Sequence, residues 1–264
     1  MTLLRDILAH RELLQNLVAR DIKSRYKGSA LGFLWSILNP LFMAAIYIFF
    51  LRLLAGRGVP HEDVIIGVFA WQFTVQCVTG GMNCITGNAN LVKKVYFPRV
   101  LLPISVVAAN LVNFLLTLAV QLVLVAVLLG LDGAHLSAWA AALPLVIAYH
   151  ALFNLALALL VASANVYFRD TQHLVGLLLS AWFFVSPVMY NLSFVEKFAG
   201  PALTPAYLLN PVALIVTAYR AAQLPGAALP WTWSAAGAWL WPLLLLAVAW
   251  RSFQRAQRNF ADWL

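Results

Sequence analysis

The sequence predicts an all-α polytopic membrane protein with six transmembrane helices. Of its 264 residues, 63% are hydrophobic and only 10% are charged, and the mean hydropathy is +0.86. A soluble domain usually carries about a quarter charged residues, so this composition leaves too few polar side chains for a water-facing surface. Apolar runs of about 20 residues recur along the chain, and a helix of that length can cross the hydrocarbon core. Basic residues flank these runs, as membrane orientation requires, so we expect no nucleic-acid partner despite the net charge of +8.

Residues 1–27 are expected to form an amphipathic cytoplasmic helix. Apolar side chains recur there at helical spacing, with charged side chains on the other faces. Such a helix can lie among lipid headgroups or dock on a partner, and the two interpretations are compatible. At residues 25–35 the basic segment gives way to an uncharged one, which marks where the chain enters the membrane.

The whole chain is predicted to be one transmembrane domain. The predicted spans cover residues 30–54, 63–86, 100–131, 136–166, 172–190 and 231–250, and a cytoplasmic tail covers residues 251–264. If the N-terminus is cytoplasmic, thirteen of the 17 basic residues fall on the inner side. The positive-inside rule then places both termini in the cytoplasm, which agrees with an even number of spans.

The connection at residues 191–230 is predicted to form short re-entrant or gate helices on the outer side. Its apolar stretches are too short to cross the membrane, and several prolines interrupt them. Non-helical backbone persists at membrane depth only where protein or water covers it. An ordinary extracellular loop is the alternative, and the apolar content argues against it.

No sequence pattern in the chain indicates catalysis. It contains no GxxxxGK[ST], GxGxxG or HExxH pattern and no Cys/His spacing typical of a metal site. The nine acidic residues lie at predicted helix ends or in loops, whereas ion-coupled carriers need ionisable sites near the midplane. We therefore expect no catalytic residue, no metal site and no cofactor in this chain, and we expect a pore-forming subunit that receives its energy from another protein.

Residues 88–99 connect the second and third predicted spans on the inner side with a compact amphipathic piece. Its Leu91, Val92, Val95 and Phe97 are candidates for insertion into a partner groove, while Lys93 and Lys94 face acidic protein or lipid. The alternative is a simple positively charged loop that only orients the protein.

Aromatic residues make up 13% of the chain, and many of them lie at predicted span ends, where amphipathic rings favour the interface. Trp71, Trp182, Phe183 and Phe184 do not fit that explanation. Aromatic faces also stack on the C–H faces of sugar rings, so these residues suggest a path along which a glycan slides.

Several motifs together resemble the ABC-2 type polysaccharide-export permeases. The motifs are RYKGSALGFLW at 25–35 with Asn39-Pro40 after it, KKVYFPRVLLP at 93–103, Arg169-Asp170, SPVMY at 186–190 and LNP at 209–211. They occur in the family's order over nearly the whole chain. The similarity is greatest to the branch that exports O-antigen and teichoic-acid glycans on undecaprenyl carriers.

The resemblance implies a homodimer in the bacterial inner membrane with two separate ATPase chains, which bind ATP and Mg²⁺, beneath it. The transported substrate would be a lipid-linked polysaccharide, and membrane lipids would surround the complex. The residues expected to couple to the ATPase are Arg20, Asp21, Lys23, Asn90, Leu91, Lys93, Lys94, Tyr96 and Phe97. The first and fifth spans would line the polymer path, which makes Trp35, Tyr47, Trp182 and Phe183 candidate lining residues. The aromatic content adds Trp71 and Phe184 to that set.

Two other functions compete with this interpretation. The first is an ABC-2 permease for a small hydrophobic drug or lipid, which the glycan-branch motifs oppose. The second is an ion-coupled secondary transporter or a passive membrane scaffold, and the scarcity of embedded acids opposes the transporter.

Overall fold

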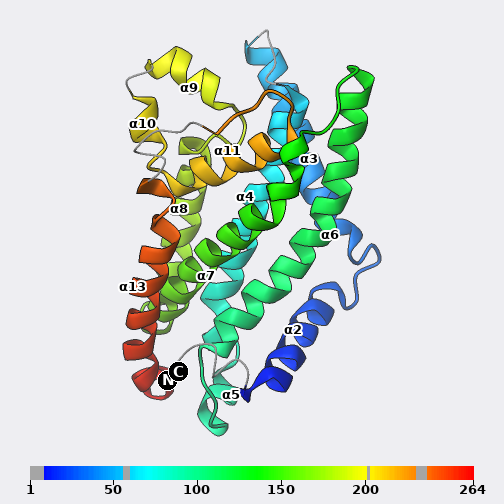
Figure 1. Cartoon of the computed structure of the whole chain (residues 1–264). Coiled ribbons are helices and arrows are strands. Elements are labelled where there is room, and N and C mark those ends of the chain that lie inside the picture. Colours follow the sequence, from blue (N-terminus) through cyan, green and yellow to red (C-terminus); the bar gives the residue numbers. More distant parts are fainter. Residues whose placement is uncertain (1–8, 56–59, 201–202, 230–236) are drawn as a thin grey trace.

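The computed structural model describes residues 9–55, 60–200, 203–229 and 237–264, and every regular element within these ranges is a helix. The long helices are α3 (Leu34–Ala55), α4 (His61–Thr86), α6 (Leu101–Leu131) and α7 (Leu143–Tyr167), which run along one bundle (Figure 1). With the short 3-10 helix η1 (Ala138–Ala142) in front of α7, these four are long and apolar enough to cross a membrane. The prediction of an all-α polytopic membrane protein is confirmed.

Two shorter helices occupy the regions of the fifth and sixth predicted spans. Helix α8 (Thr171–Val185) has 15 residues and α13 (Trp241–Ala256) has 16. At a rise of 1.5 Å per residue each is about 22–24 Å long, less than the roughly 30 Å of a hydrocarbon core. Residues 231–236 of the sixth predicted span lie outside the described residues, and α13 continues past the expected end at residue 250. The count of six spans stays a prediction.

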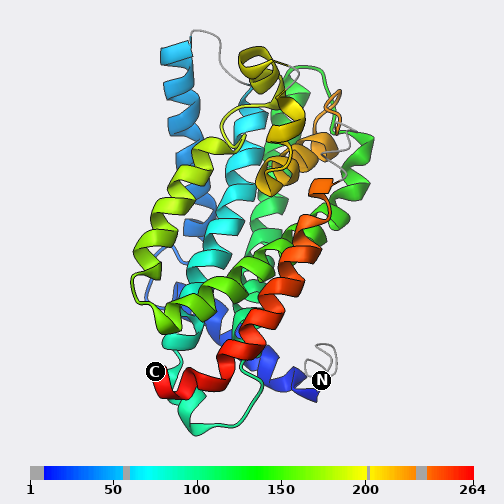
Figure 2. The ribbon, with the colours of Figure 1, turned by 90° about the vertical axis from the view of Figure 1, so that its left-hand side faces the viewer.

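The remaining helices gather at the two ends of the bundle (Figures 1 and 2). Helix α2 (Arg11–Tyr26), α5 (Ala89–Lys94), the 3-10 helix η2 (Gln257–Asn259) and α14 (Phe260–Trp263) lie toward the lower end. At the upper end lie α9 (Leu192–Ala199), α10 (Thr204–Tyr207) and α11 (Pro211–Gln223), and α11 crosses the direction of the long helices (Figure 1). The lower end is therefore built from the inner segments that the sequence analysis assigns to the cytoplasm.

Helix α4 is the centre of the bundle. It packs against α3, α6, α7, α8 and α11 and is buried along most of its length, whereas α3 exposes most of its apolar side chains. Gly81 permits the contact with α7, because a Cβ there would lie 2.8 Å from the Cβ of Ala158. Close approach at small residues is how helices pack in lipid, where the hydrophobic effect does not drive association.

Asparagine and proline residues set the ends of the helices at the outer face. Helix α8 stops just before Ser186-Pro187, and Pro187 cannot supply the backbone N–H that another turn requires. Helix α11 begins with Asn210 as its N-cap and Pro211 in its first turn, and the Asn210 side chain accepts a hydrogen bond from the Val212 N–H. These breaks let α11 pack against α4 near the outer end of the bundle.

Candidate functional site

The lower end of the bundle carries residues 88–97, which we call the coupling segment after the role predicted for it. The segment follows α4 directly. Its first residue, Asn88, donates a 2.7 Å hydrogen bond from its side chain to the backbone oxygen of Cys84 in α4. Val92 and Phe97 are only 3% and 8% exposed and belong to the apolar core at this end of the bundle. These two side chains anchor the segment to its own chain, so they are not available to a partner groove.

Five of the remaining side chains of the coupling segment are exposed. Asn90, Lys93, Lys94 and Val95 are exposed, and Tyr96 is fully exposed, while Leu91 is half-buried. A single exposed apolar residue is ordinary on a protein surface, but tyrosine is enriched at protein–protein interfaces, so Tyr96 is a candidate contact. The surface that the segment offers is therefore Tyr96 and Val95 flanked by two lysines.

Helix α2 is hydrogen-bonded to the first residue of the coupling segment. Arg20 donates a 2.9 Å hydrogen bond from Nη1 to Oδ1 of Asn88 and forms an ion pair of 3.0 Å with Asp21. Ser105 of α6 also lies within 3.4 Å of the Asp21 carboxylate. Lys23, the third residue predicted here, is exposed. Arg20 thus contacts the segment that follows α4, while Asp21 contacts Arg20 and α6.

A polar network lies one turn further along α2, where the chain turns into α3. The Arg25 guanidinium donates hydrogen bonds to the side-chain oxygens of Gln76 and Asn110, and Asn113 donates to the same Gln76 oxygen. A cavity of about 340 Å³ adjoins it, and Trp35 and Asn39 are among its lining residues. Trp35 is 46% exposed and belongs to this polar cavity, and no ring contact joins it to the other aromatic candidates among the described residues.

The other five predicted path residues form one aromatic cluster from α3, α4 and α8: Tyr47, Trp71, Trp182, Phe183 and Phe184. The Trp71 ring lies 6.2 Å from that of Trp182 and 5.8 Å from that of Phe183, in edge-to-face geometry. The Phe183 ring also lies 5.2 Å from those of Tyr47 and Phe184. Edge-to-face pairs are the arrangement that ring quadrupoles favour. Trp71 and Phe183 are buried, Phe184 is 64% exposed, and the cluster therefore runs from the core to the surface.

The aromatic cluster is joined to the outer helices by hydrogen bonds. Trp182 donates from Nε1 to Oδ1 of Asn210 at 2.9 Å, and Asn210 donates from Nδ2 to Oγ of Ser186 at 3.0 Å. The 186–190 and 209–211 motifs are thus in direct contact. Tyr190 and Tyr207 add a hydroxyl–hydroxyl contact of 3.1 Å between the same two regions.

A buried ion pair closes the outer end of α4. Arg220 of α11 lies 3.0 Å from the Asp63 carboxylate and also donates to the backbone oxygens of Asp63, Val188 and Tyr190. Burial lowers the pKa of Arg220 to about 10 against the opposing effect of Asp63, so the guanidinium stays protonated at neutral pH. Gly67 makes room for this arrangement, because a Cβ there would lie 2.1 Å from the Val188 oxygen.

The polar groups of these networks are what the sequence analysis missed. Gln76, Asn110 and Asn113 were absent from the predicted site, although amide side chains within an apolar span are a signal of interhelical hydrogen bonding. The pairing of Asp63 with Arg220 had no signal in the sequence, since 157 positions separate the two residues.

Comparison with known proteins identifies one family. Residues 12–224 match the model of the family described as ABC-2 type transporter. The matched region contains both the coupling segment and the aromatic cluster, and it ends just after α11.

Several characterised relatives are similar over most of their length. One is the O-antigen export system permease protein RfbA of Myxococcus xanthus, 38% identical over 222 residues, which are 83% of each chain. Two proteins of the same name from Klebsiella pneumoniae are 32% and 30% identical over 79% of each chain.

Proposed function

Because this chain belongs to the ABC-2 type transporter family, we propose that it is the membrane-spanning permease subunit of an ATP-driven exporter for lipid-linked, O-antigen-like polysaccharide. The observation that carries the proposal is the similarity, over 79–83% of each chain, to relatives named O-antigen export system permeases. The chain supplies the path and the coupling surface, and hydrolysis takes place elsewhere.

The assembly that we propose is a homodimer of six-span subunits in the bacterial inner membrane, with two ATPase subunits against its cytoplasmic face. ATP and Mg²⁺ bind to the ATPase subunits. Both termini of the permease are cytoplasmic. The position of α2 and α5 at one end of the bundle supports this orientation, because these two helices carry six of the thirteen inner basic residues.

The aromatic cluster supports a polysaccharide as the substrate. The C–H groups of a sugar ring carry partial positive charge and favour the negative face of an aromatic ring. Phe184 is 64% exposed and Tyr47 and Trp182 are half-buried, so these three rings can present faces to a sugar without one tight site, while the buried Trp71 and Phe183 pack behind them. A polymer can then move past them without strong binding to any single position.

The contacts of α2 support a route for coupling. The coupling segment begins at the end of α4, and its Asn88 is hydrogen-bonded to Arg20 of α2. An ATPase that binds Tyr96, Lys93 and Lys94 therefore acts on a segment connected to both helices. α2 leads into α3, and α4 contributes Trp71 to the aromatic cluster. ATP binding would shift the equilibrium between inward and outward states if the ATPase binds these two states unequally.

Reconstitution tests the proposal. This chain and its partner ABC-type ATPase are reconstituted in proteoliposomes that are loaded with an undecaprenyl-linked glycan. A membrane-impermeant glycosidase then measures the glycan that has crossed the bilayer. We expect transport with ATP, and none with an ATPase variant that lacks its P-loop lysine or with this chain alone. If an ion gradient drives transport without the ATPase, the chain is an ion-coupled carrier. If ATP drives the movement of a hydrophobic drug but not of the glycan, the chain is a drug permease. Either outcome contradicts the proposal.

A further inference from the structure

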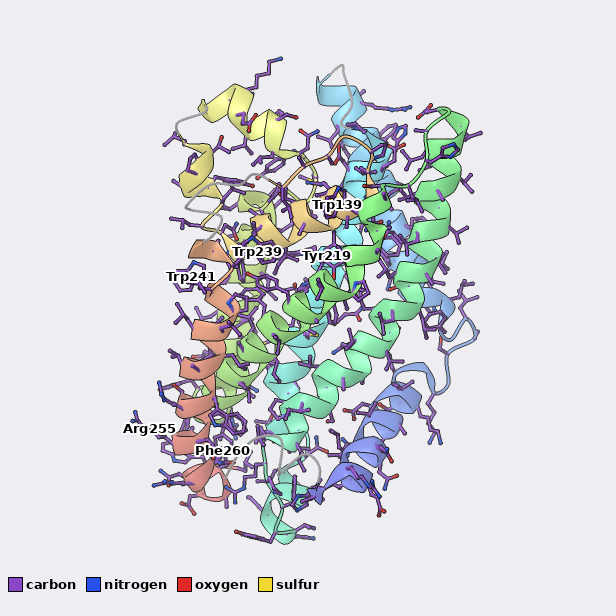
Figure 3. The ribbon with its side chains drawn as sticks, viewed as in Figure 1. Trp139, Tyr219, Trp239, Trp241, Arg255 and Phe260 are labelled. Carbon is purple, nitrogen blue, oxygen red and sulfur yellow. The ribbon has the colours of Figure 1, made fainter. Side chains whose placement is uncertain are left out.

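The C-terminal segment, residues 254–264, is folded onto the end of the bundle. The Phe260 ring is fully buried, with its centroid 5.5 Å from that of Phe253 and 6.2 Å from that of Tyr167. The Tyr167 hydroxyl donates a 2.8 Å hydrogen bond to the backbone oxygen of Ala256. Figure 3 places Phe260 and Arg255 together at this lower end. The predicted cytoplasmic tail is therefore a packed element, and it lies outside the part of the chain that the family model matches.

The C-terminal segment also packs against the coupling segment. Helix α14 packs against α5, and Phe260 shares one apolar core with Val92 and Phe97. Next to the coupling segment, Arg99 donates a hydrogen bond from Nη1 to the backbone oxygen of Gln257. A force applied to either segment is therefore transmitted to the other through packed side chains.

A groove of about 650 Å³ lies between the two segments. It is lined by residues 95–100 on one side, by Gln254, Gln257 and Arg258 on the other, and by His10 of the N-terminal region. Two of these side chains are guanidinium groups, and none of the lining residues is acidic. The exposed Lys93, Lys94 and Arg255 stand on the same two segments, and the single acid of the C-terminal segment, Asp262, is not among the lining residues.

We propose that this groove binds an acidic segment of the ATPase subunit, so that the C-terminal segment is a second docking surface beside the coupling segment. The inference rests on the proposed function. Charge complementarity selects the partner, because a positive patch favours a negative one and suppresses the wrong partners. The apolar atoms of Val95, Tyr96 and Pro98 add surface that a protein segment can cover. The segments that line the groove lie at the lower end of the bundle, beyond the middle of the long helices, where a soluble partner has access (Figure 1).

Charge reversal at Arg258 tests the proposal, with the Arg251→Glu variant as its matched control. Both arginines are exposed and belong to the C-terminal part of the chain, but only Arg258 lines the groove. The permease is placed in nanodiscs of neutral lipid, and ATPase binding is titrated by biolayer interferometry. We expect the Arg258→Glu variant to bind the ATPase about fivefold to tenfold more weakly, with a smaller salt dependence, because a charge pair becomes a repulsive contact. The Arg251→Glu variant should stay within about twofold of the unmodified protein, as is usual for a charge outside the contact.

The possible results separate this inference from the proposed function. Equal ATPase affinity of the Arg258→Glu variant and the unmodified protein overturns the groove assignment, while the unmodified permease still binds its ATPase. A loss that appears only in nanodiscs with anionic lipid also overturns it, since the groove would then contact headgroups. If the unmodified permease does not bind the ATPase at all, the proposed function itself fails. A monodisperse gel-filtration peak for each variant verifies that it folds.

Discussion

The guanidinium of Arg20 donates a 2.9 Å hydrogen bond to the side chain of Asn88, although 68 positions separate the two residues. The Asn88 side chain also donates a hydrogen bond to the last turn of α4. Asn88 therefore connects α2 to the point where α4 ends and α5 begins. Movement of the coupling segment therefore reaches both α2 and the central helix of the bundle.

The first prediction concerns this joint. The Arg20→Ala and Asn88→Ala variants should each reduce ATP-driven export by roughly twofold to tenfold, since an exposed hydrogen bond of this kind contributes about 0.5–1.5 kcal/mol. Export is measured in proteoliposomes with the partner ATPase. The Arg11→Ala variant, which removes an exposed arginine from the same helix, serves as the control and should leave export unchanged. Equal export from all three variants would show that this bond has no part in coupling.

The second prediction separates the two neighbouring rings of the coupling segment. Tyr96 is fully exposed and Phe97 is 8% exposed, so the Tyr96→Ala variant should keep its unfolding temperature and lose ATPase stimulation by the permease. The Phe97→Ala variant should lose roughly 3–5 kcal/mol of stability, as is usual for a truncated buried phenylalanine. Scanning fluorimetry in detergent and stimulated ATPase activity distinguish the two. Unchanged stimulation in the Tyr96→Ala variant would move the ATPase contact elsewhere.

The third prediction tests the bond between the aromatic cluster and the outer helices. The Trp182→Phe variant keeps an aromatic ring but loses the donor to Asn210 and part of the packed ring volume, which should cost about 1–3 kcal/mol and lower the apparent unfolding temperature by several degrees. The Trp139→Phe variant is the matched control, because that ring is 72% exposed, and its unfolding temperature should not change. If both variants unfold at the same temperature, the hydrogen bond does not hold the outer helices.

The fourth prediction concerns the close approach of the outer loop to α4. The Gly67→Ala variant places a methyl group 2.1 Å from the backbone oxygen of Val188, so the loop must move and the variant should be severely destabilised or fail to express. Gly130 in α6 has open space around it, and the Gly130→Ala variant should be neutral or up to about 1 kcal/mol more stable. Thermal unfolding of the purified variants measures both. Normal stability of the Gly67→Ala variant would contradict the packing described here.

The fifth prediction addresses the ion pair between Asp63 and Arg220. The Asp63→Asn variant leaves a buried guanidinium without its counter-charge, and loss of one partner of a buried pair costs roughly 3–5 kcal/mol. The Arg220→Lys variant should also be destabilised. The ammonium of lysine lacks the planar, divided set of N–H donors with which the guanidinium reaches several backbone carbonyl oxygens at once. Unfolding in denaturant measures the change. Glu196→Gln, at an exposed acid on the same face, is the control and should shift stability by less than about 0.5 kcal/mol.

Much of the fold could be predicted from the sequence, because hydropathy and helical spacing are local properties. The apolar runs identify the long helices α3, α4, α6 and α7, and proline and asparagine residues mark where the outer helices begin. Charge and a place between two spans made the inner connector a candidate partner contact, the family resemblance implied its coupling role, and that role stays a prediction. Five of the six aromatic path candidates do lie in one cluster, since they come from helices that pack together.

The tertiary structure decided which face of each element is available. Val92 and Phe97 carry the same apolar character as Val95, yet only Val95 is exposed, because the rotation of a short helix depends on what packs beneath it. The same holds for the partners of Arg25, for the pair of Asp63 and Arg220, and for the C-terminal segment against α5. Each of these contacts joins residues far apart in the chain. Sequence spacing therefore locates the helices of this protein, while its charged and polar contacts follow from how those helices are rotated and packed in three dimensions.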